Sequence, residues 1–291
     1  MSNKTKLFLT ISILFSILIP LFAFEWPQDN IQSSKINTYF GQKRAQTISN
    51  SITFSESENV KATDDGNISI IITEHDDGFN WFESPLGTAV IISHEDSLQS
   101  VYGNLDTYEI NPDILKSPKI KKGTRISTTG NSGWQEDNSF LEFQVLDSKN
   151  NNFVNPLILM PRLNSQNELT ISKVQLKNKF GKYYDLSTQT QIPSGIYKIF
   201  KSRQNLAIPY KISIAVNGIE SEQITFDTLK MDQNDLAIEG QTFYTVSDIY
   251  PNETNMLIGE IYLPNGQNTL RIIQTDFAGN KTSKTFKIST Y

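Results

Sequence analysis

The stretch SFLEFQV (residues 139–145) decides the fold of the first part of the chain. Apolar Leu141, Phe143 and Val145 alternate with other side chains, and this period of two is typical of a β-strand with one buried face. The opposite face carries Glu142, which packing in an apolar core does not explain.

The same short period continues through most of the chain and predicts an all-β fold class. Alternating segments are separated by turn sequences such as Asp-Asp-Gly, Asn-Ser-Gly and Pro-Asn-Gly, and no long amphipathic helix is visible. The clearest of these segments are residues 68–72, 89–93, 140–146, 210–216, 269–274 and 285–288.

The chain has 291 residues, enough for two domains of about 100–200 residues each. Near residues 160–173 the alternation gives way to Pro, Asn, Ser and Gln, before a second series of strands begins. We therefore predict an N-terminal segment (1–24), a first domain (25–163) and a second domain (164–291).

The N-terminal segment has the features of a secretory signal peptide. Lys4 and Lys6 precede an apolar run over residues 7–24, and Ala23 is a small residue suited to cleavage. The run of about 18 residues is also close to the minimum for a transmembrane helix, so an uncleaved N-terminal membrane anchor is the alternative. Either interpretation predicts an exported protein of the periplasm or cell envelope.

Composition excludes several classes of function. The chain contains no cysteine, so disulfides, thiolate zinc sites, cysteine nucleophiles and a lipoprotein anchor are all excluded. Its formal net charge is −5 without a basic cluster, which argues against nucleic acid as a partner.

Five segments of the first domain occur in a familiar order. They are TYFGQKR (38–44), GTAVIISHEDSLQSVYGNL (87–105), IKKGTRISTTGNSG (120–133), LEFQV (141–145) and FVNPLILMP (153–161). Together they resemble the lysostaphin-type, or LytM-type, metallopeptidase domain. The resemblance covers about residues 26–161 and implies a LytM-type β-sheet domain.

The resemblance also implies a zinc site, with ligands from a His-x-x-x-Asp segment and from a later His-x-His strand. Such a site holds a water whose pKa the metal lowers, and a neighbouring histidine handles the proton. In this chain Ser49 and Thr53 stand at the first pair of positions, Phe140 and Glu142 at the second, and Asn104 at the proton-handling position. We therefore predict no catalytic residue, no metal and no cofactor.

Other residues do not rebuild the site. The chain has only two histidines, His75 in the acidic TEHDDG segment and His94 in VIISHEDS. We expect His75 to be a solvated turn residue and His94 to be a hydrogen-bonded residue at a strand end. Glu142 alone is one carboxylate without defined partners, which is a poor zinc site.

We expect the altered groove to bind a ligand and to be bounded by Tyr102, Asn104, Phe140 and Glu142. Phe140 either forms an apolar groove floor or fills a repacked core, and the sequence leaves both interpretations open. Trp81 and Trp134 are candidate contact residues at the groove rim, with packing under a long loop as the alternative.

The second domain resembles a bacterial immunoglobulin-like β-sandwich. The resemblance rests on NGQNTLRIIQTDFAGNKTSKTFKI (265–288), a strand, an Asp-x-x-Gly-Asn turn and a closing strand. Asp276 and Asn280 offer far fewer oxygen ligands than the six to eight of a typical calcium site, so we expect them to cap the turn.

Together these features predict a non-catalytic envelope protein. Its expected partner is a cell-wall amidase, another envelope protein or peptidoglycan, because inactive LytM-type domains act as amidase activators. Unlike those activators, the chain has no visible coiled coil before the domain. One alternative is an unconventional peptidoglycan hydrolase that uses Glu142, and another is a structural adaptor that acts through the second domain.

Overall fold

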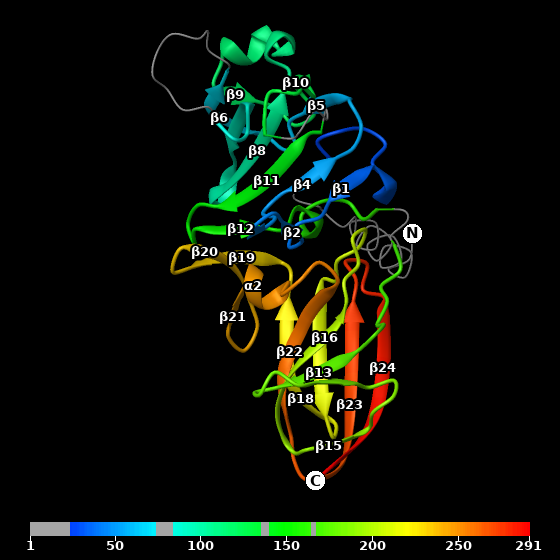
Figure 1. Cartoon of the computed structure of the whole chain (residues 1–291). Coiled ribbons are helices and arrows are strands. Elements are labelled where there is room, and N and C mark those ends of the chain that lie inside the picture. The colour runs from blue at the N-terminus through cyan, green and yellow to red at the C-terminus, as the bar shows by residue number, and fades with distance from the viewer. Residues whose placement is uncertain (1–23, 74–83, 135–139, 164–166) are drawn as a thin grey trace, which may run out of the picture.

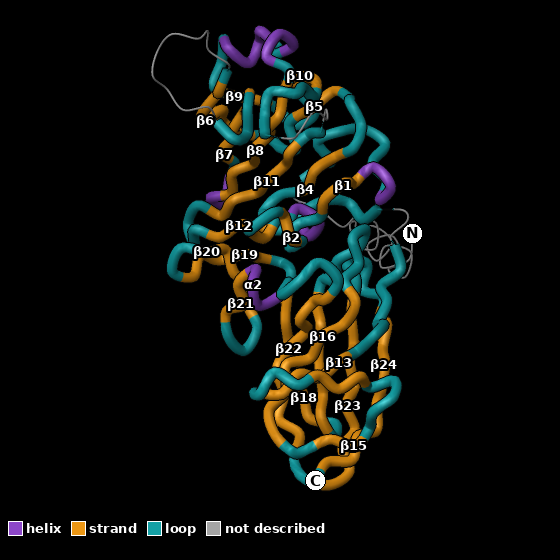
Figure 2. Tube along the Cα trace, viewed as in Figure 1, coloured by secondary structure: helices purple, strands orange, loops and turns teal. Residues whose placement is uncertain are grey.

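The computed structural model describes residues 24–73, 84–134, 140–163 and 167–291, and most regular structure in these ranges is β, as the sequence predicts. Figure 1 shows an N-terminal body of mostly blue to green strands and a C-terminal body of yellow-green to red strands, and Figure 2 shows how little helix either contains. No helix in the described ranges is long and apolar enough to span a membrane. The predicted signal peptide or anchor falls almost wholly in residues 1–23, outside the described residues.

The N-terminal body is built around β11 (Glu142–Asp147). This strand contains Phe143 and Val145 of the alternating pattern, and Leu141 directly precedes it. It begins at Glu142, two residues later than the alternation predicts. On one side β11 pairs along its length with β8 (Leu98–Leu105), and on the other it pairs first with β4 (Ile52–Phe54) and then with β12 (Asn152–Val154). All three residues of the pattern are fully buried.

The remaining strands of this body extend that sheet or flank it. Beyond β8 the order continues through β7 (Thr88–Ser93), β6 (Gly66–Ile72) and β9 (Lys119–Ile120), while β1 (Ile36–Thr38) pairs with β4. Two small ribbons are separate from the sheet: β2 (Lys43–Arg44) with β3 (Thr47–Ile48), and β5 (Asn59–Lys61) with β10 (Arg125–Thr128).

The C-terminal body consists of two sheets whose inward-facing apolar residues belong to one buried cluster. One sheet has the order β14 (Tyr183–Asp185), β13 (Gln175–Asn178), β16 (Gly195–Ser202) and β22 (Asn255–Leu263). The other has the order β15 (Gln191–Ile192), β24 (Lys281–Thr290), β23 (Gly266–Thr275), β17 (Lys211–Val216) and β18 (Ile219–Thr225). The immunoglobulin-like character of the C-terminal body stays a prediction.

One segment of the second half of the chain belongs to the first sheet. The first sheet has 11 strands because β19 pairs with β12. Its last three strands are β19 (Thr228–Asp232), β20 (Asp235–Glu239) and β21 (Phe243–Thr245). The helix α2 (Val246–Ile249) follows β21 and leads into β22. The boundary that we place at residue 163 is therefore crossed by a continuous sheet, visible where β19 and β20 lie under β12 in Figure 1.

Buried contacts reinforce this junction. Asn155, which is fully buried, donates its side-chain amide to the Phe226 carbonyl at 2.7 Å, and its backbone N–H donates to the Asp227 carbonyl at 2.7 Å. Gly41 has φ +84°, and a Cβ there would lie 2.9 Å from a ring carbon of Phe226, so glycine is required by both conformation and space. The Tyr250 hydroxyl donates to the Gly41 carbonyl at 2.7 Å.

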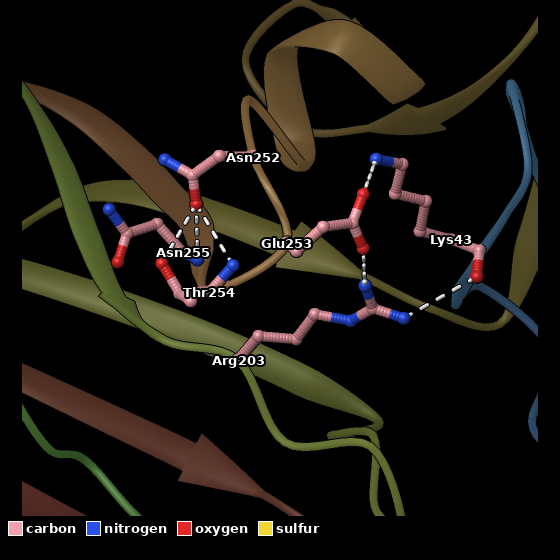
Figure 3. A network of polar contacts seen from close by, with 6 residues as sticks. All are labelled: Lys43, Arg203, Asn252, Glu253, Thr254 and Asn255. Carbon is pink, nitrogen blue, oxygen red and sulfur yellow. Dashed lines mark hydrogen bonds and ion pairs between the residues drawn. The ribbon is translucent and has the colours of Figure 1, made fainter.

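An exposed polar network adds to the junction (Figure 3). Glu253 is ion-paired with Lys43 of the first body and with Arg203 of the second, whose Nη1 lies 3.2 Å from the carboxylate. The hydrogen bond from Lys43 lowers the pKa of the Glu253 carboxyl. Asn252 accepts hydrogen bonds from the Thr254 and Asn255 backbones and so fixes the turn that carries Glu253. Since exposed ion pairs are weak, we assign most of the junction energy to the buried contacts.

We expect Asn155→Ala to lower the free energy of unfolding by about 1–3 kcal/mol, because the substitution leaves the buried Phe226 carbonyl without its side-chain donor. Urea unfolding followed by circular dichroism measures this change. The matched control is Asn234→Ala in the exposed β19–β20 turn, for which we expect a change within about 0.5 kcal/mol. Equal effects of the two substitutions would contradict the assigned role of Asn155.

A buried lysine predicts a pH dependence of stability. Lys201 is 1% exposed and donates to the Thr170 and Ser202 carbonyls, and burial lowers its pKa to about 8 from an ordinary value of 10.5. The unfolded chain therefore binds more protons between these values, so stability rises with pH above about 8. We expect the contribution of Lys201 to stability to rise by about 1–2 kcal/mol from pH 8 to pH 9.5.

Urea unfolding at the two pH values tests this expectation. Lys201→Met should abolish the gain, whereas Lys198→Met, on the same strand but 42% exposed, should retain it. An unchanged gain in Lys201→Met would show that another group titrates.

Candidate functional site

Three of the positions that the sequence predicts to replace catalytic residues meet around the start of β11. In the sheet register Glu142 lies opposite Thr53 of β4 on one side and opposite Gly103 of β8, next to Asn104, on the other. The structure therefore brings together three of the positions identified from sequence. Thr53, Asn104 and Glu142 are all buried.

An ion pair occupies the centre of this cluster. Arg44 Nη1 lies 2.8 Å from Glu142 Oε1, and the side-chain amide of Gln144 donates to the same oxygen at 3.1 Å. The Glu142 side chain is 5% exposed and that of Arg44 is 34% exposed, so the carboxylate is removed from water and the guanidinium partly covers it. A charge-assisted hydrogen bond of this kind neutralises Glu142 without a metal ion.

Sequence reasoning missed Arg44, although the residue belongs to the TYFGQKR segment that carries the family resemblance. The two partners are 98 positions apart, and local periodicity gives no signal for such a contact. The β2–β3 ribbon that holds Arg44 also contacts the second body through Lys43, and the side chain of neighbouring Gln42 donates to the Asn205 carbonyl at 2.8 Å.

Asn104 acts as a structural connector. It adopts a left-handed backbone conformation (φ +60°), which asparagine tolerates better than most residues. Its side-chain amide donates to the Phe140 carbonyl at 2.6 Å, and its side-chain oxygen accepts from the Gly133 N–H at 2.8 Å. The side chain that we expect at a proton-handling position thus joins β8 to the segments before β11.

Tyr102 does not bound an open groove, which corrects the expectation from sequence. Its ring is fully buried and packs against Phe143 with ring centroids 5.2 Å apart. Its hydroxyl accepts hydrogen bonds from the Thr63 backbone at 2.8 Å and from the Ser100 hydroxyl at 3.1 Å. Tyr102 therefore belongs to the core, and this burial raises the pKa of its hydroxyl.

The other expected site residues differ in exposure. Ser49 is buried and its hydroxyl donates to the Ser51 carbonyl at 3.1 Å, whereas Phe140 is half-buried. Trp134 is 65% exposed. Loop residues 74–83 lie outside the described residues, so packing of Trp134 under that loop stays a prediction. Trp81 lies outside the described residues. The candidate binding surface in the described ranges is therefore reduced to Phe140 and Trp134.

The residues at the ligand positions do not fit a zinc ion. Ser49 and Thr53 supply hydroxyls, Phe140 supplies a ring, and Glu142 already binds a guanidinium. Within the described ranges, no cluster of three or more His, Cys, Asp and Glu side chains is placed to hold a metal ion.

His94 is held by structural hydrogen bonds. As the sequence predicts, His94 is hydrogen-bonded at a strand end, with Nδ1 2.8 Å from the Asp65 carbonyl oxygen and Nε2 2.7 Å from the Ser100 hydroxyl. His75, expected in a solvated turn, lies outside the described residues.

Comparison with known proteins identifies two matching regions. A family model described as peptidase family M23 matches residues 48–156, and a second family model matches residues 168–291. An uncharacterized protein of Treponema pallidum (strain Nichols) is 37% identical over 60 residues. That match covers 21% of this chain and 41% of the relative, so the chain spans less than half of the relative's length.

Solved structures give more distant similarities. The SpoIIQ–SpoIIIAH pore-forming complex includes a chain that is 18% identical, with a TM-score of 0.37, and the match covers 50% of this chain and 94% of that chain. A zinc-containing peptidase from Vibrio cholerae is 23% identical, with a TM-score of 0.36, and covers 48% of this chain and 40% of that chain.

We expect Arg44→Met to lower the free energy of unfolding by about 1–3 kcal/mol, because it leaves the buried Glu142 carboxylate without its cation. Adding Glu142→Gln should recover part of this loss, since a neutral amide is less costly to bury than a carboxylate. The control is Arg125→Met, which removes the exposed pair with Glu109 and should change stability by less than about 1 kcal/mol. Chemical unfolding of the variants would contradict the assigned pair if Arg44→Met behaves like the control.

Proposed function

Because residues 48–156 form a peptidase family M23 (LytM-type) domain, we propose that this protein is a non-catalytic member of the cell envelope that acts by binding. The observation that carries the proposal is the ion pair between Arg44 and Glu142 at the centre of the altered site. A guanidinium cation there satisfies the Glu142 carboxylate, and it has no open coordination position for a water molecule.

Hydrolysis of an amide by this family requires an activated water and a group that stabilises the developing oxyanion. Serine and threonine hydroxyls with ordinary acidity do not lower the pKa of a bound water as a zinc ion does. Asn104 is engaged by the Phe140 and Gly133 backbones and cannot exchange a proton as a histidine does. The domain therefore retains the fold of a peptidase without its chemistry.

The alternative is an unconventional peptidoglycan hydrolase that uses Glu142 as its acid or base. Such a residue must come within hydrogen-bond distance of the reacting group. Burial of Glu142 and its pairing with Arg44 disfavour that role, because a substrate would have to displace the guanidinium first.

The proposed location is the periplasm or cell envelope, and it rests on the signal-peptide or anchor features of residues 1–24. The proposed partner is a cell-wall amidase, another envelope protein or peptidoglycan itself. The acidic chain is not suited to nucleic acid. The immunoglobulin-like second domain provides an additional surface, so a structural adaptor role is compatible with the proposal.

We expect the purified protein to contain far less than one equivalent of zinc and to release no muropeptides from peptidoglycan. Metal analysis and chromatography of digested cell walls measure the two quantities, with an active M23 peptidase as the positive control. Stoichiometric zinc together with chelator-sensitive release would refute the proposal. Release without zinc that Glu142→Gln abolishes would support the unconventional hydrolase instead.

A further inference from the structure

Two adjoining cavities of about 600 Å³ each lie on the C-terminal body, within the size range of ligand sites. They share Ile196 and Lys198 of β16 and Glu260 of β22. The first cavity continues past β22 to Phe243 of β21, and the second continues to Phe180 in the β13–β14 turn. Together they form a trough across the outer face of one sheet, bounded by Phe180, Ile196, Lys198, Phe243, Glu260 and Tyr262.

The floor of the trough is an exposed apolar pair. Ile196 and Tyr262 are directly opposite each other on β16 and β22 and are 55% and 60% exposed. Phe180 is 82% exposed at one end, while Phe243 and Ile219 are exposed at the other. Large apolar side chains gathered along one trough are typical of an interaction site, whereas isolated ones are ordinary.

The charges of the trough are separated along its length. Of the residues that line only the cavity next to Phe243, Asp248 and the buried Glu222 are acidic, and Nζ of Lys198 lies 3.6 Å from Oδ1 of Asp248. Glu260 and Lys198 line both cavities. The end next to Phe180 carries Lys177 and Lys179. A ligand that matches both ends is therefore positive where the carboxylates lie and negative where the lysines lie.

One wall of the trough is fixed by buried hydrogen bonds. Glu222, which is 2% exposed, accepts from the Tyr244 hydroxyl at 2.7 Å and from the Gln241 N–H at 3.0 Å. These bonds hold the loop before β21 and β21 itself against β18, while β19 and β20 connect β21 to the sheet of the first body. The trough is thus preformed, and both bodies contribute to it.

We propose that the trough binds an extended segment of a partner protein, with apolar residues at its centre, a basic residue at the carboxylate end and an acidic residue at the lysine end. The trough crosses three strands spaced about 4.8 Å apart, so it accommodates about four to six extended residues of the partner. The carboxylate end disfavours anionic lipid surfaces and nucleic acid, because it would repel their phosphates. This inference goes beyond the proposed function and does not depend on whether the first domain hydrolyses peptidoglycan.

Fluorescence anisotropy with labelled synthetic peptides tests the proposal on the purified protein. The probes are the dipolar peptides KKLVLVEE and EEVLVLKK, compared with the single-charge peptides KKLVLVKK and EELVLVEE. We expect at least one dipolar peptide to bind about tenfold more tightly than both single-charge peptides. Tyr262→Ser and Glu260→Lys should each weaken that binding by about fivefold or more.

Matched controls keep the result interpretable. Tyr108→Ser removes a tyrosine that is 93% exposed in the first body, and Glu95→Lys reverses an exposed acid there, so neither should change peptide affinity. The proposal is overturned if no dipolar peptide is preferred, or if Tyr262→Ser and Glu260→Lys bind like the wild type. Binding to isolated peptidoglycan that Tyr262→Ser abolishes, without any peptide preference, would assign the trough to glycan instead. Zinc content and muropeptide release remain a separate measurement of the proposed function.

Discussion

The pairing of β12 with β19 is the interaction on which the rest of the arrangement depends. It joins a three-stranded extension from the second half of the chain to the first sheet, and Asn155 satisfies the adjacent buried carbonyl of Phe226. Because of this junction, the β2–β3 ribbon lies against the second body, where Lys43 and Gln42 bind Glu253 and Asn205. The same ribbon carries Arg44, so the contact between the bodies supports the centre of the altered site.

At the start of β11 a guanidinium stabilises the Glu142 carboxylate. A zinc ion in a peptidase is a Lewis acid with an open position, whereas a guanidinium directs fixed hydrogen bonds at a carboxylate and activates no water. Asn104 and Tyr102 have corresponding structural roles, since each satisfies backbone groups of neighbouring segments. The Arg44–Glu142 pair and these backbone contacts therefore stabilise this part of the sheet.

Much of the first domain is predictable from sequence because its information is local. The order of five short segments identifies the fold, and the M23 family match to residues 48–156 confirms it. The alternation of Leu141, Phe143 and Val145 correctly marks a buried face. The expectation for Tyr102 is wrong because alternation separates the two faces of a strand without revealing that other segments cover both.

The sequence by itself determined the all-β class and the M23 resemblance, since each depends on residue type and short spacing. Only the tertiary structure decided that Arg44 neutralises Glu142, that β19, β20 and β21 join the first sheet, and that Ile196 and Tyr262 remain exposed. The physical reason is that these properties depend on contacts between residues far apart in the chain. Local periodicity specifies which side of a strand is apolar, but the partner of each strand edge and the cover of each face are set by the packing of the whole chain.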